Sequence, residues 1–251
     1  MGLDGKVCII TGGGSGIGRA SAMMMAEEGA TVVVVGRTAS KVNDVKAEIE
    51  AAGGRSASFA LDVADHAAVN LMVRSVKDEF GRIDVVVNNA GHSSPHRKLL
   101  TTTPEEIRSV IDSNLVGTIF CTQAVMPSML EAGQGTVINV SSLAGVTPGL
   151  MGGMIYSAAK AAVINFTQFL GSEFRNSGVR FSVVIPGEID TPILDKRPVP
   201  PSADARATMA TAEDTAEAIA LIARLPDRAA IPQLVIKPTM PRDTTGEVGV
   251  A

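Results

Sequence analysis

Tyr156 and Lys160 are the residues whose types and spacing point most directly to chemistry. They are four positions apart in a segment with a helical pattern, so their side chains leave the same face and an ammonium lies beside a phenol. A free phenol titrates near pH 10, and a nearby cation favours its ionised form. The pair therefore predicts that Lys160 lowers the pKa of Tyr156 and that Tyr156 transfers protons at neutral pH. The same spacing also occurs on ordinary amphipathic helices, so the surrounding motifs decide between the two interpretations.

Composition and charge favour one globular domain over residues 1–251. Apolar residues make up 45% and charged residues 19%, and the net charge of −4 without a basic run argues against nucleic-acid binding. No apolar stretch of membrane-spanning length and no signal-like start are present, which predicts a cytoplasmic protein without a membrane segment. Cys8 and Cys121 each lie in an apolar run and are expected to be reduced core thiols. The three histidines lack zinc spacings, so no metal site is expected.

Short β-branched runs alternate with longer segments of helical period along the whole chain. Several runs are apolar on both faces, which is typical of a parallel sheet covered by helices on both sides. We therefore expect an α/β fold with a doubly wound, seven-stranded parallel sheet, a Rossmann fold, in a single domain. The expected strands are residues 7–11, 31–35, 58–61, 85–88, 136–140, 179–185 and 234–236, the helices include 19–28, 104–130 and 155–174, a substrate loop covers about 191–209, and residues 244–251 form a frayed tail.

A glycine-rich turn follows the first expected strand. Residues 11–18 read Thr-Gly-Gly-Gly-Ser-Gly-Ile-Gly and lead directly into a helical pattern. Free backbone N–H groups and the helix dipole at such a junction attract a phosphate, and glycines let the ligand approach the backbone. The turn therefore predicts a dinucleotide phosphate site, with a flexible loop without a ligand as the alternative.

Five motifs in order resemble the short-chain dehydrogenase/reductase family. They are the turn at residues 11–18, Asn-Asn-Ala-Gly at 88–91, Ser142, Tyr156 with Lys160, and Pro-Gly at 186–187, and they span nearly the whole chain. The resemblance implies an oxidoreductase with a nicotinamide cofactor. It also implies a cofactor site made of Gly12, Gly14, Ser15, Gly16, Ile17, Gly18, Arg37, Asp62, Val63, Asn89, Ala90, Gly91, Tyr156, Lys160, Pro186, Gly187, Ile189 and Thr191. For Asp62, which would contact the adenine, a helix N-cap is the alternative.

Arg37 at the end of the second strand bears on the choice of cofactor. A carboxylate at this position accepts the ribose 2′-hydroxyl of NAD, whereas an arginine accommodates the 2′-phosphate of NADP. The chain reads Val35-Gly36-Arg37-Thr38 with no acid there, so NADP(H) is the predicted cofactor. NAD(H) remains the alternative if Arg37 only stacks on the adenine.

The catalytic group implied by the resemblance is Asn114, Ser142, Tyr156 and Lys160. Ser142 would hold the substrate oxygen, with Ser141 as the fallback, and Asn114 would hold a water that connects Lys160 to solvent. Tyr156 would exchange a proton with a substrate that is interconverted between a ketone or aldehyde and an alcohol. An NAD-dependent dehydrogenase of the same family, an epimerase or dehydratase, and a non-catalytic NADP-responsive binding protein are the rival functions.

The substrate pocket is expected to take its walls from residues 93–96, 143–154 and 193–206. Leu150, Met151, Met154, Ile193 and Leu194 predict an apolar pocket for a small carbonyl or alcohol substrate, although core packing explains methionines equally well. His92 and His96 are candidates for substrate contact or plain surface residues. The helices at 104–130 and 155–174 imply, by the resemblance, a homo-oligomer, a dimer or tetramer.

Overall fold

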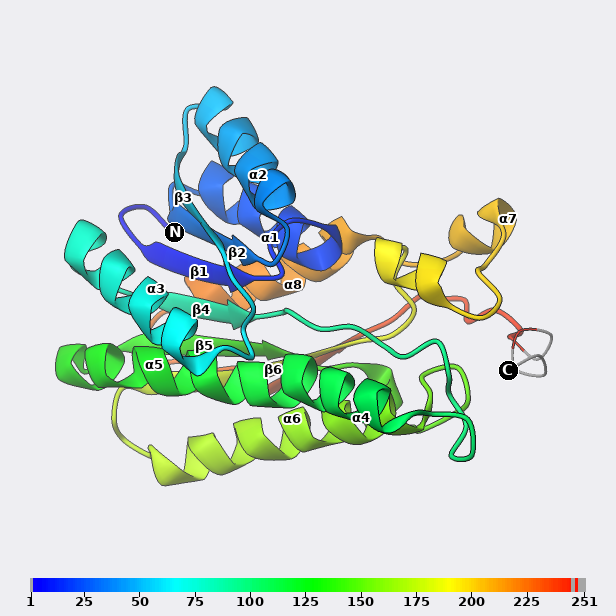
Figure 1. Cartoon of the computed structure of the whole chain (residues 1–251). Helices are drawn as coiled ribbons and strands as arrows, with labels where there is room; N and C mark the ends of the chain where they lie inside the picture. Colours follow the sequence, from blue (N-terminus) through cyan, green and yellow to red (C-terminus); the bar gives the residue numbers. More distant parts are fainter. Residues whose placement is uncertain (1, 245–246, 248–251) are drawn as a thin grey trace.

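Seven parallel strands form one sheet in the order β3-β2-β1-β4-β5-β6-β7, as predicted (Figure 1). The computed structural model describes residues 2–244 and residue 247. The strand order reverses between β1 and β4, and at such a point a crevice opens beyond the carboxyl ends of the strands. The strands are β1 (Val7–Thr11), β2 (Thr31–Gly36), β3 (Arg55–Ala60), β4 (Val85–Asn88), β5 (Gly135–Val140), β6 (Val179–Pro186) and β7 (Gln233–Ile236).

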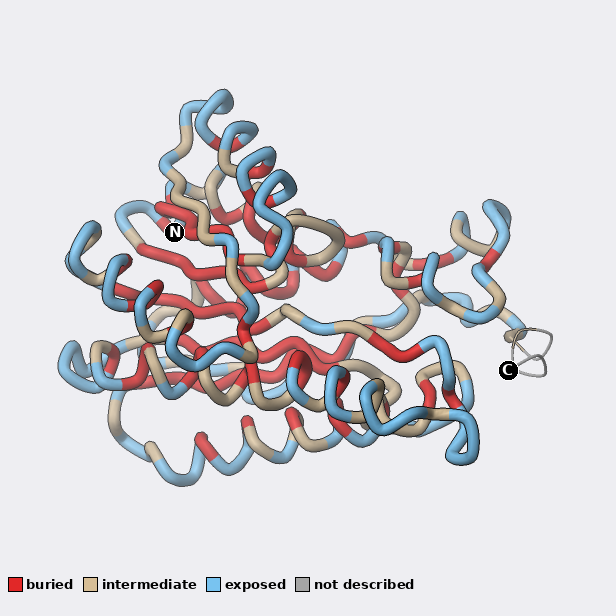
Figure 2. Tube along the Cα trace, in the orientation of Figure 1, coloured by how far each residue is buried: buried red, intermediate tan, exposed pale blue. Residues whose placement is uncertain are grey.

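Helices cover both faces of this sheet. On one face α1 (Gly16–Glu27), α2 (Ala39–Ala51) and α8 (Ala212–Arg224) enclose a core that includes Met25, Ile49 and Ile219. On the other, α3 (His66–Phe80), α5 (Gly117–Ala132) and α6 (Met154–Glu173) enclose a second core. The five inner strands are buried while the edge strands β3 and β7 and the outer sides of the helices are more exposed, which is the pattern expected of inner strands that are apolar on both faces (Figure 2). Cys8 in the first core and Cys121 in a smaller cluster with Val63 and Val69 are buried free thiols, as predicted.

Arg180 ties the end of α8 to the middle of the sheet. Its guanidinium is buried on β6 and donates to the Thr136 hydroxyl on β5 at 2.7 Å. It also donates to the backbone carbonyls of Leu225, Pro226 and Ala229, at 2.9 to 3.2 Å. One cation thereby satisfies three carbonyls of the turn that leads to β7.

The helix expected over residues 104–130 contains a wider turn. It begins as α4 (Pro104–Ile111), passes through a π-helical turn (Asp112–Val116) and continues as α5. A capping box of Thr103 and Glu106 begins it. By length and composition alone, Pro104–Ala132 is apolar enough to cross a membrane, but Cys121, Val125 and Met129 pack against the sheet or a neighbouring helix.

Element boundaries differ from the sequence expectation most at β3, at α1 and within residues 191–209. β3 begins at Arg55, not at residue 58, because it pairs with β2 along a polar stretch that has no local strand signal. Helix α1 begins at Gly16, inside the glycine turn. Residues 191–209 contain a 3₁₀ turn (Pro192–Lys196) and a short helix, α7 (Ala203–Arg206), which projects beyond the sheet (Figure 1). The expected tail at 244–251 lies mostly outside the described residues.

Candidate active site

The glycine turn between β1 and α1 forms one end of a cavity of about 490 Å³. Gly12 and Gly16 have φ of +66° and +51°, which other residues rarely adopt. A Cβ on Gly18 would stand 2.3 Å from the Gly12 carbonyl oxygen, so the close contact of turn and helix requires a glycine there. The first turn of α1 carries no acidic residue, and the Ser15 side chain does not cap it. The helix N-terminus therefore presents backbone N–H groups without a competing carboxylate, which suits a phosphate.

Thr11 joins the ends of β1 and β4 beneath this cavity. Its hydroxyl accepts hydrogen bonds from the backbone N–H groups of Asn89 and Ala90, at 3.0 and 3.1 Å. The Asn89 amide in turn donates to the Thr11 carbonyl at 3.1 Å. This network holds Asn89, Ala90 and Gly91 at the switch point of the sheet, where all three line the cavity.

Tyr156 and Lys160 lie at the other end of the same cavity, on the first turns of α6. The Lys160 ammonium is 5.7 Å from the centre of the Tyr156 ring and donates to the Val140 carbonyl at 2.9 Å. Lys160 is buried, whereas Tyr156 is partly exposed to the cavity. The predicted pair is thus brought together, and it faces the same space as the glycine turn.

Burial dominates the pKa values of this pair. Burial raises the pKa of Tyr156, and a hydrogen bond with Ser142 and the positive charges of Arg97 and Arg197 oppose that shift to a smaller extent. Burial also lowers the pKa of Lys160 to about 8. This differs from the expectation that Lys160 lowers the phenol pKa. The ammonium is directed at a backbone carbonyl, and two arginines that are distant in sequence provide the positive field instead.

The two serines at the end of β5 have different surroundings. The Ser142 hydroxyl is the hydrogen-bond neighbour of the Tyr156 phenol and also accepts from Ala144 N at 3.2 Å. The Ser141 hydroxyl is buried and donates to the Lys160 carbonyl at 2.7 Å, which ties β5 to α6. Of the two hydroxyls, Ser142 is therefore the one that influences the phenol pKa.

Asn114 lies in the π-helical turn and is fully buried. Its amide nitrogen donates to the carbonyls of His92 and Val110, both at 2.8 Å, while its Oδ1 has no partner among the described residues. A Cβ on Gly91 would stand 2.3 Å from this Oδ1 and 3.4 Å from the Lys160 ammonium. The amide is thus clamped with a free acceptor near Lys160, an arrangement that suits a bridging water. π-Helical turns are frequent at functional sites.

The segment after β6 forms part of the cavity wall. Gly187 N donates to the Ile236 carbonyl at 2.7 Å, and a Cβ on Gly187 would stand 2.8 Å from Lys237 Cβ. Thr191 packs against Gly16 of the glycine turn and is buried. Pro186, Gly187, Ile189 and Thr191 all line the cavity, as do Gly12, Ser15, Gly16, Ile17, Asn89, Ala90, Gly91, Asn114, Ser142, Tyr156 and Lys160.

Five predicted cofactor residues do not line this cavity: Gly14, Gly18, Arg37, Asp62 and Val63. Arg37 is exposed at the end of β2, and its guanidinium is 3.9 Å from the Asp62 carboxylate. Asp62 accepts a hydrogen bond from Ala64 N, but the N-cap of α3 is Asp65, so the helix-cap alternative for Asp62 is wrong. The Val63 side chain packs in the core with Val69 and Cys121.

Two arginines in the cavity wall were missed by sequence reasoning. Arg97 lies one residue beyond the expected wall at 93–96, and Arg197 lies inside 193–206 but had no assigned role. The apolar residues Leu143, Met151, Ile193 and Leu194 do line the cavity, whereas Leu150, Met154, His92 and His96 do not. The pocket is therefore less apolar than predicted. No local pattern marks Arg97, because its position depends on a contact with α6.

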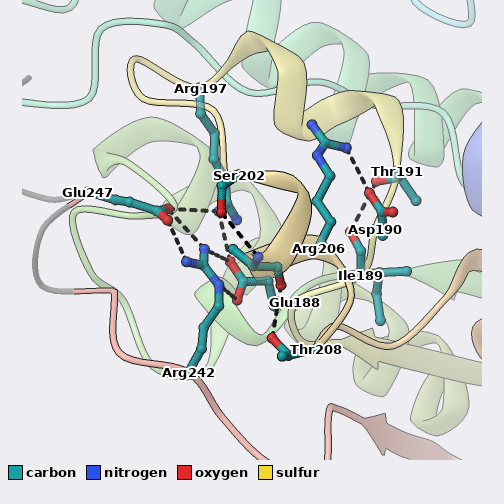
Figure 3. Close-up of polar contacts among 11 residues, drawn as sticks. Glu188, Ile189, Asp190, Thr191, Arg197, Ser202, Arg206, Thr208, Arg242 and Glu247 are labelled. Atoms are coloured by element: carbon teal, nitrogen blue, oxygen red, sulfur yellow. Dashed lines mark hydrogen bonds and ion pairs between the residues drawn. The ribbon is translucent and has the colours of Figure 1, made fainter.

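A network of ion pairs fixes the loop at 191–209. Arg197 binds Glu188 at 2.8 Å, and Arg242 binds both Glu188 and Glu247 (Figure 3). Arg206 of α7 binds Asp190 at 2.7 Å and also pairs with Asp195. These contacts join the loop to the end of β6 and to the last described residues.

Curated proteins and a family model match most of this chain. The family model described as short chain dehydrogenase matches residues 6–199. The 3-oxoacyl-(acyl-carrier-protein) reductase FabG of Thermotoga maritima is 38% identical over 198 residues, which cover 79% of this chain and 80% of that protein. The cis-4-hydroxycyclohexanecarboxylate dehydrogenase of Sinomonas cyclohexanicum is 38% identical over 227 residues, covering 87% and 89%.

Solved structures match the fold over nearly the whole chain. A metagenomic short-chain oxidoreductase in complex with NADP has a TM-score of 0.82 and 33% identity, covering 95% of this chain and 99% of that one. The closed form of serine dehydrogenase complexed with NADP⁺ has a TM-score of 0.85 and 29% identity, covering 92% and 94%. This chain therefore belongs to the short-chain dehydrogenase/reductase family and is an oxidoreductase that acts on CH–OH and C=O groups.

Proposed function

We propose that this protein is an NADP(H)-dependent reductase or dehydrogenase that interconverts a ketone or aldehyde and an alcohol, with Tyr156 as the general acid and base. One observation carries the proposal: a single cavity joins the glycine turn of α1 to the Tyr156 phenol. The turn suits the phosphates of a dinucleotide. A bound nicotinamide cofactor supplies or accepts the hydride.

The side chains around Tyr156 divide the remaining work. Because burial raises the phenol pKa, Tyr156 is protonated at neutral pH and is ready to donate to the oxygen of a carbonyl. Ser142, already within hydrogen-bond reach of the phenol, fixes that oxygen by a second hydrogen bond. In the reverse direction, the charges of Arg97 and Arg197 favour the phenolate that accepts the proton.

Lys160 and Asn114 support proton exchange behind Tyr156. The Lys160 ammonium remains mostly charged at pH 7, since its pKa is about 8. The free Oδ1 of Asn114 offers an acceptor for a water that connects this ammonium to solvent. In this role Asn114 acts through Lys160 and positions the water.

The Tyr156→Phe variant tests the mechanism directly. NADPH consumption with a panel of ketones and aldehydes is expected to fall at least about a hundredfold, the lower range for a positioned general acid. The Kd for NADPH, measured by fluorescence titration, is expected to stay within about twofold because the ring is retained. Near-normal turnover in the variant would exclude Tyr156 as the proton donor.

The preference for NADP(H) rests on Arg37. Its exposed guanidinium lies at the end of β2, and the nearest carboxylate, Asp62, is 3.9 Å away in an exposed pair that holds it only weakly. A 2′-phosphate is a stronger partner for a planar guanidinium. The ratio of kcat/KM for NADPH over NADH is therefore expected to fall at least about tenfold in Arg37→Ala. An unchanged ratio would remove Arg37 from cofactor selection.

The proposed assembly is a dimer or tetramer formed through the helices that run over the α5 and α6 face. Phe169 on α6 is 59% exposed and Leu130 on α5 is 41% exposed, and such apolar side chains favour burial against a second copy. Light scattering coupled to size-exclusion chromatography measures the mass. A monomer across the micromolar range would contradict this assembly.

A further inference from the structure

The Arg97 guanidinium is a buried cation without a partner in the cavity wall. Its exposure is only 6%, and its Nε has no hydrogen-bond partner among the described residues. No ion pair joins it to any acid in the described part of the chain. Burial of an unpaired charge costs free energy, so a protein that keeps one usually uses it. The unpaired guanidinium of Arg97 therefore suggests that an anionic ligand binds there.

Two acids beside the cavity, Glu188 and Glu247, are already engaged. Glu188 is bound by Arg197 at 2.8 Å and by Arg242 at 2.7 Å, and Glu247 pairs with the same two arginines (Figure 3). Two carboxylates thus balance two guanidiniums. Arg97 takes no part in these ion pairs, and the charge of Arg197 is among the causes that lower the pKa of Arg97, after burial.

Arg97 is held at a fixed place relative to Tyr156. Its backbone carbonyl accepts from Met154 N at 3.0 Å, at the start of α6. Its side-chain stem packs on Gly153, where a Cβ would stand 3.0 Å from Arg97 Cγ. Tyr156 is only two residues beyond Met154, and the side chains of Arg97 and Tyr156 line the same cavity. A ligand group bound to Arg97 is therefore presented to Tyr156 at a defined distance.

We propose that Arg97 selects substrates that carry a carboxylate, so that the substrate class is a small hydroxy or oxo acid. This inference rests on the proposed function for the reacting C=O or CH–OH group. A planar guanidinium binds a carboxylate through two parallel hydrogen bonds. Leu143, Met151 and Ile193 line the same cavity and enclose the carbon skeleton. Because the cofactor shares the cavity, the acid is small.

A binding experiment tests the carboxylate site independently of turnover. Benzoate, cyclohexanecarboxylate and 4-oxopentanoate, each beside its primary amide, are titrated calorimetrically into the full-length protein with saturating NADP⁺. At least one acid is expected to bind more tightly than its amide. Arg97→Met is expected to weaken that acid at least about thirtyfold, as for loss of one partner of a buried charge pair, and its amide by less than about threefold.

Two controls separate recognition from a structural role. Lys98→Met removes an exposed cation next to Arg97 in sequence and is expected to leave acid binding within about twofold. Arg97→Met is also expected to raise the melting temperature, because it removes an unpaired buried charge. If Arg97 had a structural role instead, Arg97→Met would lower the melting temperature.

The outcomes distinguish this inference from the proposed function. If no acid binds more tightly than its amide, or if Arg97→Met weakens both alike, the carboxylate site is wrong. If acids bind through Arg97 but neither 4-oxopentanoate nor any carbonyl compound consumes NADPH, the proposed function fails and the site stands. If neutral ketones are reduced and no acid binds, the carboxylate site fails and the proposed function stands.

Discussion

Gly91→Ala is expected to damage the site through Asn114 rather than through Gly91 itself. The new Cβ would stand 2.3 Å from Asn114 Oδ1 and 3.1 Å from Asn114 Cγ, and an ordinary contact is about 3.4 Å or more. The amide would therefore have to move by about 1 Å. It cannot do so and keep its two 2.8 Å hydrogen bonds to His92 and Val110.

The size of the effect follows from those contacts. Loss of hydrogen bonds by a fully buried amide costs about 1–3 kcal/mol of unfolding free energy, which corresponds to roughly 3–10 °C in Tm for a chain of this size. Displacement of a positioned group by about 1 Å lowers turnover up to about a hundredfold. Denaturant unfolding and steady-state kinetics measure the two losses.

The Asn114→Ala background provides the matched control. Once the Asn114 amide is removed, the remaining neighbour of the new Cβ is the Lys160 ammonium, and the distance of 3.4 Å between them is an ordinary contact. Adding Gly91→Ala to Asn114→Ala is therefore expected to cost less than about 0.5 kcal/mol, so the two substitutions are strongly non-additive. Additive losses in stability and turnover would refute the reasoning.

Three further perturbations follow from the structure. Since the pKa of Lys160 is about 8, kcat/KM for carbonyl reduction is expected to decline as pH rises through 8. Lys160→Arg is expected to remove this decline, because the arginine stays charged. The same decline in the variant would show that another group causes it. Gly18→Ala would place a Cβ 2.3 Å from the Gly12 carbonyl and is expected to raise the Kd for NADPH at least about tenfold in a fluorescence titration, with wild-type affinity as the contrary result. Arg180→Met removes the guanidinium that bonds the carbonyls of Leu225 and Ala229 after α8, and it is expected to lower the unfolding free energy by about 2–3 kcal/mol in a denaturant titration. A change below about 0.5 kcal/mol would show that water replaces the guanidinium.

The fold was readable from sequence wherever local signals and burial agreed. Strands such as β1 and β4 were predicted to the residue, because continuous β-branched runs between turn signals leave one interpretation. β3 was cut short, since Arg55, Ser56 and Ala57 carry no strand signal and become a strand only by pairing with β2. The loop at 191–209 contains helical turns for a similar reason: Ser202 and the Arg206 ion pairs stabilise them in context.

The site separates in the same way. The sequence predicts the pair of Tyr156 and Lys160 because their spacing on one helix already brings the two side chains together. The glycine turn is likewise a single local segment. Arg97 was missed because its place depends on a hydrogen bond to Met154, 57 residues away, and no periodicity reports such a contact. Lys160 is not among the causes of the Tyr156 pKa shift, because helical spacing predicts proximity but not where an ammonium is directed.

By itself, the sequence determined the order of the elements, the glycine turn and the pair on α6, since these depend on residues that are neighbours along the chain. Only the tertiary structure decided that Ser142 rather than Ser141 acts on the phenol. Within the described residues, it also decided that Asn114 keeps a free acceptor beside Lys160 and that an unpaired guanidinium shares the cavity. Those features depend on burial and on directions set by packing between distant segments, and electrostatic interactions are strongest where that packing excludes water.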